Sequence, residues 1–223
     1  MSNKIKLAVF DVDGVLLDSM GIWKQVGDET LERNGLVLDP ETRKWIDTLT
    51  VGEVAAYLNE RYHLCDTDEE IEREICGAVE AAYETSIPTK PHVPELLRWL
   101  REHGVRMCIL TASEAYYVKS ACERLDILQY FDRLYTCSEI GWSKYETECF
   151  AHVLQEMNVH ADEAVMFEDS IHALITAQEA GMRTVGVEDL PWNEEKIPQL
   201  QEKADWYVND YRRIPELFQN LVE

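Results

Sequence analysis

Two pairs of acidic residues directly follow short apolar runs of the chain. Asp11 and Asp13 come after Leu-Ala-Val-Phe. Glu168 and Asp169 come after Ala-Val-Met-Phe. If both runs are parallel strands, their carboxyl ends meet at the sheet edge where open α/β proteins bind ligands. Either pair alone also fits a helix N-cap, but together they predict one cation site. Oxygen-only ligands favour Mg²⁺ over softer metals.

Two further polar segments follow predicted strands. Thr111-Ala112-Ser113 offers a hydroxyl and backbone N–H groups at a helix N-terminus, which can hold a phosphate group. Lys144 lies in a loop-like Gly-Trp-Ser-Lys segment and supplies a cation that this acidic chain otherwise lacks. Each segment alone is weak, because Ser and Thr are frequent helix caps and most loop lysines are simply solvated. Combined with the acidic pairs, they predict a site for a phosphorylated ligand.

Six apolar or β-branched runs are predicted to be strands, at residues 6–12, 105–110, 133–137, 164–167, 184–187 and 206–208. From Val105 onward, segments with helical spacing separate them, which is the alternation of βαβ units. The sequence therefore predicts an α/β fold with a doubly wound, Rossmann-like parallel-sheet core. A last short helix is expected over residues 212–223.

Between Asp18 and Ser86 no strand-like run occurs, and apolar residues fall at helical intervals. Chain breakers flank this segment, with Gly14 before it and Pro88 and Pro91 after it. We expect an α/β catalytic core formed by residues 1–17 and 87–223, and an inserted all-helical cap at 18–86.

Composition narrows the range of partners. Twenty-one basic and 43 acidic side chains give a net charge of −22, which disfavours binding to nucleic acid or to an anionic membrane.

No apolar run approaches the length of a bilayer span, and no signal-peptide pattern opens the chain, so a cytoplasmic location is expected. The six cysteines contain no C-x-x-C and are expected to be reduced thiols.

The order D-x-D-G, T-A-S, K and E-D-S, each after its own strand, resembles the haloacid dehalogenase superfamily. The resemblance spans essentially the whole chain, and its first motif is the most specific. Within the superfamily, the chain looks like the branch of phosphatases and β-phosphoglucomutases with a helical cap. Dehalogenases of the superfamily lack the second aspartate, which is present here as Asp13, so dehalogenation is disfavoured.

The resemblance implies a role for each matching residue. Asp11 would be the nucleophile that attacks phosphorus, and Asp13 the general acid and base. The Asp11 side chain, the Asp13 carbonyl and the Asp169 side chain would hold Mg²⁺, with Glu168 supporting it directly or through water. The transferring phosphoryl group would be bound by Thr111, the Ala112 amide and Lys144. These roles agree with the general chemistry of phosphoryl transfer, in which the protein mainly positions the reacting groups and neutralises their charge.

The chain departs from the family pattern at two places. Tyr145 and Glu146 stand where proline usually follows the motif lysine, which leaves the loop's shape open. Ala173 replaces the usual glycine after the fourth motif, and His172 beside it is expected on the helix surface. Trp23 and Trp142 lie close to the motifs in the sequence and are the first candidates for lining a substrate cleft. Aromatic residues at helical spacing more often belong to the core.

These features predict a magnesium-dependent phosphatase that hydrolyses a small phosphorylated metabolite through a phospho-aspartyl intermediate. The alternative is β-phosphoglucomutase-like phosphoryl transfer, which in the family uses a cap arginine. The stretch Asp47 to Glu53 has no arginine, and this disfavours the mutase. A catalytically idle binding module is a third reading, disfavoured because every motif residue is present. The sequence determines neither the substrate nor the oligomeric state.

Overall fold

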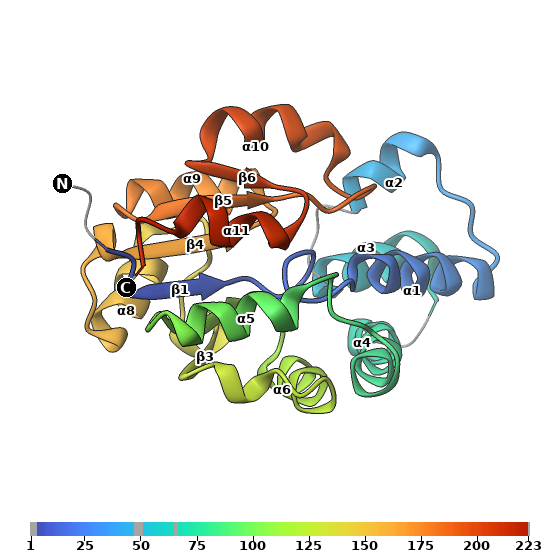
Figure 1. The fold of residues 1–223 in the computed structure, drawn as a ribbon. Coiled ribbons are helices and arrows are strands. Elements are labelled where there is room, and N and C mark those ends of the chain that lie inside the picture. Colours follow the sequence, from blue (N-terminus) through green and yellow to red (C-terminus); the bar gives the residue numbers. More distant parts are fainter. Residues whose placement is uncertain (1–3, 47–50, 65–66, 223) are drawn as a thin grey trace. The chain divides into compact units, whose positions relative to one another are not determined.

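A six-stranded parallel sheet forms the centre of the larger part of the molecule (Figure 1). The computed structural model describes residues 4–46, 51–64 and 67–222. The strand order is β3-β2-β1-β4-β5-β6. The strands are β1 Leu7–Phe10, β2 Arg106–Thr111, β3 Arg133–Thr136, β4 Ala164–Glu168, β5 Arg183–Val187 and β6 Trp206–Val208. This topology confirms the predicted doubly wound α/β fold, and each predicted strand is present with its ends shifted by at most a residue or two.

Helices connect the strands and flank the sheet (Figure 1). The α-helices of this part are α5 Val93–Glu102, α6 Ala115–Arg124, α7 Cys137–Ile140, α8 Thr147–Met157, α9 Ile171–Glu179, α10 Ile197–Lys203 and α11 Ile214–Phe218. Short 3₁₀ turns are η1 Leu128–Tyr130, η2 Ala161–Glu163, η3 Glu194–Lys196 and η4 Tyr211–Arg213.

The last helix is shorter than predicted. Instead of covering residues 212–223, α11 spans only Ile214–Phe218, after the separate turn η4. The chain then runs beside its own first residues, where the Leu221 carbonyl accepts a hydrogen bond from the Ile5 amide at 2.6 Å. This contact joins the two ends of the described chain.

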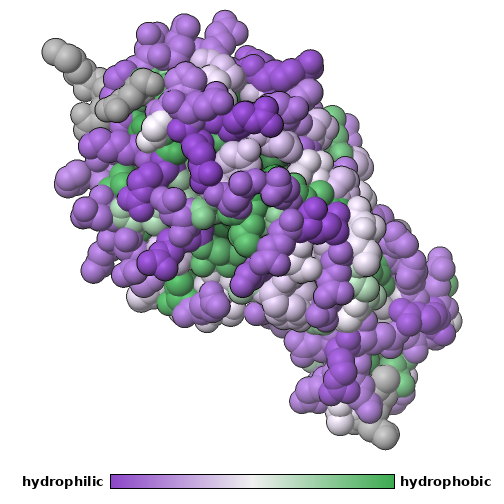
Figure 2. Space-filling model, turned by 60° about the horizontal axis from the view of Figure 1, so that its bottom comes forward, coloured by the Kyte–Doolittle hydropathy of each residue, from purple (hydrophilic) through white to green (hydrophobic). Residues whose placement is uncertain are grey.

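Alternating side chains of the strands fill the two faces of the sheet. On one face, residues such as Val9 and Met166 join a buried cluster with α8 that includes Phe150. On the other face Phe10 stacks on Phe167 with ring centroids 4.4 Å apart. Because the central strands are buried on both faces, they read as continuous apolar runs. Figure 2 shows the contrasting exterior, where hydrophilic residues cover most of the visible face.

The second compact unit is all-helical and comprises Met20–Ser86. Its helices are α1 Met20–Arg33, α2 Pro40–Ile46, α3 Val51–Tyr62 and α4 Asp68–Thr85. The apolar stripe predicted from the sequence is its core: Ile71, Ile75 and Val79 of α4 are buried. The other unit comprises Met1–Ser19 and Ile87–Glu223. The insertion of a helical unit directly after the first strand and its turn agrees with the predicted fold class.

The structure also bears on the cysteines and on membrane-spanning helices. Four cysteines form no disulfide within the described part of the chain: Cys108, Cys122, Cys137 and Cys149. Cys65 lies outside the described residues. Among the described helices, none is both long and apolar enough to cross a membrane.

Candidate active site

The register of the central strands brings the two acidic pairs together. In the pairing of β1 with β4, Phe10 lies opposite Phe167, and the Asp11 amide donates to the Phe167 carbonyl at 3.1 Å. Asp11 and Glu168 are therefore neighbours at the carboxyl edge of the sheet. Ligand oxygens of Asp11, Glu168 and Asp169 all lie within 4.8 Å of one another. The sequence pattern predicted one cation site from all four paired acids, and the Asp13 side chain is not part of this group of described residues.

Gly14 forms the turn that follows the first acidic pair. Its φ is +76°, in the left-handed region that glycine adopts without strain. A methyl group built on Gly14 would lie 2.7 Å from Asp169 Oδ2, closer than real contacts allow. Glycine is thus required here for its backbone angle and because the carboxylate of Asp169 packs directly against the turn.

Lys144 reaches the acidic cluster from the loop before α8. Its Nζ lies 2.5 Å from Asp11 Oδ1 and 2.9 Å from Glu168 Oε2, and the lysine is only 9% exposed. Burial opposes its charge, but the two carboxylates hold the pKa of the ammonium above its ordinary range. Within this loop, Glu146 accepts hydrogen bonds from the Ser143 amide and hydroxyl, both at 2.9 Å.

Two hydroxyl groups hold the second aspartate of the first motif. Ser113 Oγ donates to Asp13 Oδ2 at 2.6 Å, and Ser19 Oγ donates to Asp13 Oδ1 at 2.5 Å. Thr111 is fully buried, and its Oγ1 accepts a hydrogen bond from the Ser113 amide at 3.0 Å. Ala112 between them is exposed. The Thr-Ala-Ser segment at the end of β2 therefore meets the Asp-x-Asp turn at the end of β1.

The donor set and its electrostatics fit a divalent cation. Burial, together with the charges of Glu168 and Asp13, raises the pKa of Asp11 to about 8 despite the opposing effect of Lys144. Burial and the neighbouring carboxylates Glu168 and Asp11 likewise raise the pKa of Asp169. Packed carboxylates that resist ionisation in this way are stabilised by a cation, and an all-oxygen set suits Mg²⁺.

These shifts predict a pH dependence of stability for the metal-free protein. The pKa of Asp11 is about 8 in the folded state and near 3.8 when unperturbed. Between those values the folded state binds more protons than the unfolded state, so the free energy of unfolding falls as pH rises. We expect a lower urea midpoint at about pH 8.5 than at about pH 5.5 in chelator. Saturating Mg²⁺ should shrink this difference, as should Asp11→Asn. A slope that neither change affects would contradict the assignment.

Four residues at this edge of the sheet were not predicted from the sequence: Ser19, Lys90, Asp189 and Asn193. Asp189 follows β5 in the same way as the other acids follow β1 and β4. A search for acids at the carboxyl end of the fifth strand would therefore have found it. Asn193 Nδ2 donates to the Asp169 carbonyl at 3.3 Å and to the Val187 carbonyl at 2.9 Å. No local sequence signal marks Ser19, Lys90 or Asn193.

The aromatic candidates and His172 lie in different surroundings. Trp23 is on α1, where its Nε1 donates to the Tyr83 hydroxyl at 3.3 Å. Trp142 is 37% exposed and tilts against His152 with ring centroids 5.7 Å apart. The role of both tryptophans in a cleft stays a prediction. His172 is exposed on α9, 5.8 Å from the Tyr145 ring. Residues 47–50 of the stretch used against the mutase lie outside the described residues.

Comparisons with known proteins agree with the motif order. The family model for haloacid dehalogenase-like hydrolases matches residues 8–187. Phosphorylated carbohydrates phosphatase of Thermotoga maritima is 22% identical over 181 residues, which are 81% of this chain and 84% of that protein. Hexitol phosphatase B of Escherichia coli (strain K12) is 25% identical over 199 residues, covering 83% and 84%.

The fold is shared with determined structures. A haloacid dehalogenase family hydrolase from Deinococcus radiodurans R1, solved with bound phosphate and sodium, has a TM-score of 0.74 and is 22% identical. The similarity covers 98% of both chains. The family match spans most of the chain, and both the strand topology and the helical insertion agree with it. This chain therefore belongs to the haloacid dehalogenase-like hydrolases, in the helical-cap branch of phosphatases and β-phosphoglucomutases, and is a phosphoric monoester hydrolase.

Proposed function

We propose that the protein is a Mg²⁺-dependent phosphatase that hydrolyses a small phosphorylated metabolite through a phospho-aspartyl intermediate at Asp11. The observation that carries the proposal is the cluster at the carboxyl edge of β1 and β4. There a buried carboxylate, Asp11, is within 2.5 Å of a buried lysine and beside two further acids. Such a group can act as a nucleophile toward phosphorus when cations neutralise the approaching phosphate.

The reaction would proceed in two steps. In the first, an Asp11 oxygen forms a bond to phosphorus while the ester P–O bond breaks, and Asp13 gives a proton to the leaving oxygen. In the second, Asp13 takes a proton from water, whose oxygen attacks phosphorus and releases inorganic phosphate and free Asp11. Ser19 and Ser113 hold both oxygens of Asp13, so these hydroxyls orient the proton donor.

The remaining residues would bind charge. The Asp11 and Asp169 side chains and the Asp13 carbonyl would hold Mg²⁺, with Glu168 in support, and the cation would neutralise the phosphoryl oxygens. Lys144, Thr111 and the Ala112 amide would bind the transferring group. Lys144 bridges Asp11 and Glu168 without substrate, so it is positioned to share its charge with a phosphate that approaches Asp11.

The substrate class is inferred from relatives. The two similar phosphatases are named for phosphorylated carbohydrates and for hexitol phosphates, and each covers more than four-fifths of this chain. A sugar phosphate or sugar-alcohol phosphate is therefore the first substrate class to test. The chain's net charge of −22 requires that an anionic substrate meet local cations, which Mg²⁺ and Lys144 would provide.

The test is phosphate release from a panel of phosphorylated sugars, sugar alcohols and nucleotides, with Mg²⁺ and with a chelator. We expect release from at least one sugar or sugar-alcohol phosphate, abolished by the chelator and restored by added Mg²⁺. The panel includes β-glucose 1-phosphate with a trace of glucose 1,6-bisphosphate. Formation of glucose 6-phosphate without phosphate release would show that the protein is a mutase and not a phosphatase. Phosphate release in the presence of the chelator would overturn the proposed dependence on Mg²⁺.

A further inference from the structure

A fourth carboxylate lies at the same edge of the sheet, after β5. Asp189 is 2% exposed, and its Oδ1 is 2.5 Å from Lys90 Nζ. Its other oxygen, Oδ2, is buried and has no hydrogen-bond partner within the described part of the chain. A buried carboxylate oxygen without a donor is costly, because the desolvation of the charged group is left uncompensated. This oxygen therefore requires an explanation.

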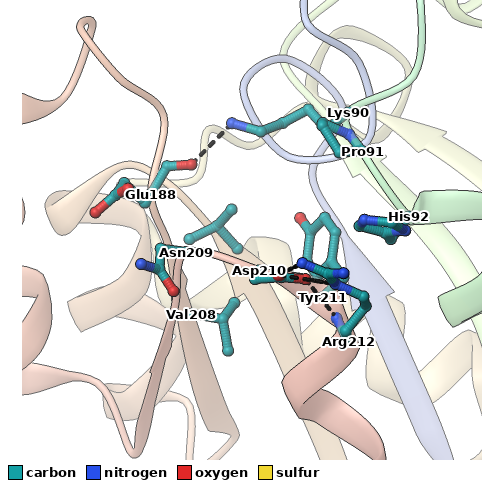
Figure 3. Close-up of a pocket in the computed structure, with 10 residues that line it drawn as sticks. Lys90, Pro91, His92, Glu188, Val208, Asn209, Asp210, Tyr211 and Arg212 are labelled. Atoms are coloured by element: carbon teal, nitrogen blue, oxygen red, sulfur yellow. Dashed lines mark hydrogen bonds and ion pairs between the residues drawn. The ribbon is translucent and has the colours of Figure 1, made fainter.

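The orientation of Asp189 is fixed by its neighbours. Lys90, which precedes α5, donates to Asp189 Oδ1. It also donates to the Glu188 carbonyl at 2.8 Å (Figure 3). The Asp189 amide donates to Asn193 Oδ1 at 2.9 Å. The lysine borders a cavity of about 190 Å³ that His92, Asp210 and Arg212 help to line. Held by these contacts, the carboxylate presents one oxygen to the lysine and directs the other away from it.

The second oxygen of Asp189 lies against the Gly14 turn, close to Asp169 of the candidate cation site. A methyl group built on Gly14 would lie 2.9 Å from Asp189 Oδ2 and 2.7 Å from Asp169 Oδ2. The sum of these distances is the most that can separate the two oxygens, so both flank the turn that carries the first acidic pair. Asn193 links the same loops, because it bonds to the Asp189 amide and to the Asp169 carbonyl.

The charges around this point do not balance without a cation. The carboxylates of Asp11, Glu168, Asp169 and Asp189 meet the ammonium groups of Lys144 and Lys90. Lys144 pairs with Asp11 and Glu168, and Lys90 pairs with Asp189. Asp169 has no ion pair with a described residue. Carboxylates therefore outnumber ammonium groups at this edge of the sheet, and this excess favours the binding of a cation.

We propose that Asp189 is a positioning residue of the cation site, whose buried carboxylate beside Asp169 strengthens Mg²⁺ binding by its charge and position. The inference rests on the proposed function, in which the Asp11 and Asp169 side chains would hold Mg²⁺. Mg²⁺ keeps several of its waters in protein sites, so carboxylates beyond its direct ligands contribute to its affinity. Lys90 holds Asp189 in place through the opposite oxygen.

A purely structural role would make a different prediction. If Asp189 only fixes the loop through Lys90 and Asn193, an isosteric asparagine retains Oδ1 as an acceptor and leaves cation affinity unchanged. If the charge of Asp189 attracts the cation, asparagine removes that charge and weakens cation binding. Cation affinity separates the two roles without substrate or turnover.

The experiment measures Mn²⁺ binding by calorimetry and by electron paramagnetic resonance, with Mg²⁺ competition, for wild type and Asp189→Asn. Glu194→Gln is the matched control, since it removes one negative charge from an exposed residue of η3 nearby. We expect the dissociation constant of Asp189→Asn to rise about 10-fold or more, and that of the control to stay within about 2-fold. Circular dichroism of the metal-free variants checks that each is folded.

An unchanged dissociation constant in folded Asp189→Asn would overturn the role of Asp189 alone. If that variant does not fold, Asp189→Glu replaces it. The longer side chain displaces the carboxylate, and wild-type affinity in this variant would equally overturn the role. Absence of Mn²⁺ binding by wild type would overturn the metal assignment itself. Binding by wild type without phosphate release from any substrate would instead overturn the phosphatase, which keeps the two failures distinguishable.

Discussion

Asp11→Asn is expected to abolish phosphate release, with a loss in kcat on the order of 10⁴-fold or more. The amide has nearly the same shape as the carboxylate but cannot form the acyl phosphate. The metal-free variant should be at least as stable as wild type, because burial already disfavours the charged form of Asp11. Lost activity in a stable protein therefore distinguishes a chemical role from damage to the fold.

The intermediate itself can be detected at this residue. Borohydride reduces an aspartyl phosphate to homoserine, so reduction of wild type during turnover should convert Asp11, identified by peptide mass spectrometry. Asp132→Asn is the matched control, because Asp132 is 40% exposed and pairs with Arg106 at the start of β2. We expect the control to keep its activity and its labelling at Asp11. Labelling at another aspartate, or an Asp11→Asn variant that retains turnover, would contradict the assignment.

Lys144→Met is the second substitution with a large expected effect, and here both stability and activity should fall. The lysine is buried between Asp11 and Glu168, so its loss leaves two buried carboxylates without their cation. Breaking a buried ion pair from one side costs about 3–5 kcal/mol. Removal of a preorganised charge at the phosphoryl group is expected to lower kcat by about 10²- to 10³-fold.

The stability loss of Lys144→Met should depend on pH in a defined direction. Without the lysine, the pKa of Asp11 rises further, and protonation removes the uncompensated charge. The deficit relative to wild type should be smaller at about pH 5.5 than at about pH 8.5, measured by urea unfolding in chelator. Lys6→Met is the control, because Lys6 pairs with Glu163 while 58% exposed. Such a surface pair contributes about 1 kcal/mol or less. Equal losses in both variants would contradict a special role for Lys144.

The fold class could be predicted from the sequence alone, and so could the acids at the ends of β1 and β4. Central strands of a parallel sheet are buried on both faces, so β1 and β4 read as apolar runs whose ends are marked by Asp11 and Glu168. The helical insertion was predictable because its buried residues, such as Ile71 and Val79, keep the helical period. Both signals are local, since they depend only on which faces of one element are buried.

Which side chains meet at the site could not be predicted from the sequence. Ser113 contacts Asp13 across 100 residues of sequence, and Lys90 contacts Asp189 across 99. These contacts follow from strand order and register, which place the ends of β1, β2, β4 and β5 along one edge. The contact of Lys144 with Asp11 likewise joins residues far apart in the sequence, through a loop in which Glu146 bonds to Ser143. A sequence pattern records the burial of each element, but the distance between side chains on different elements is set only when the sheet assembles.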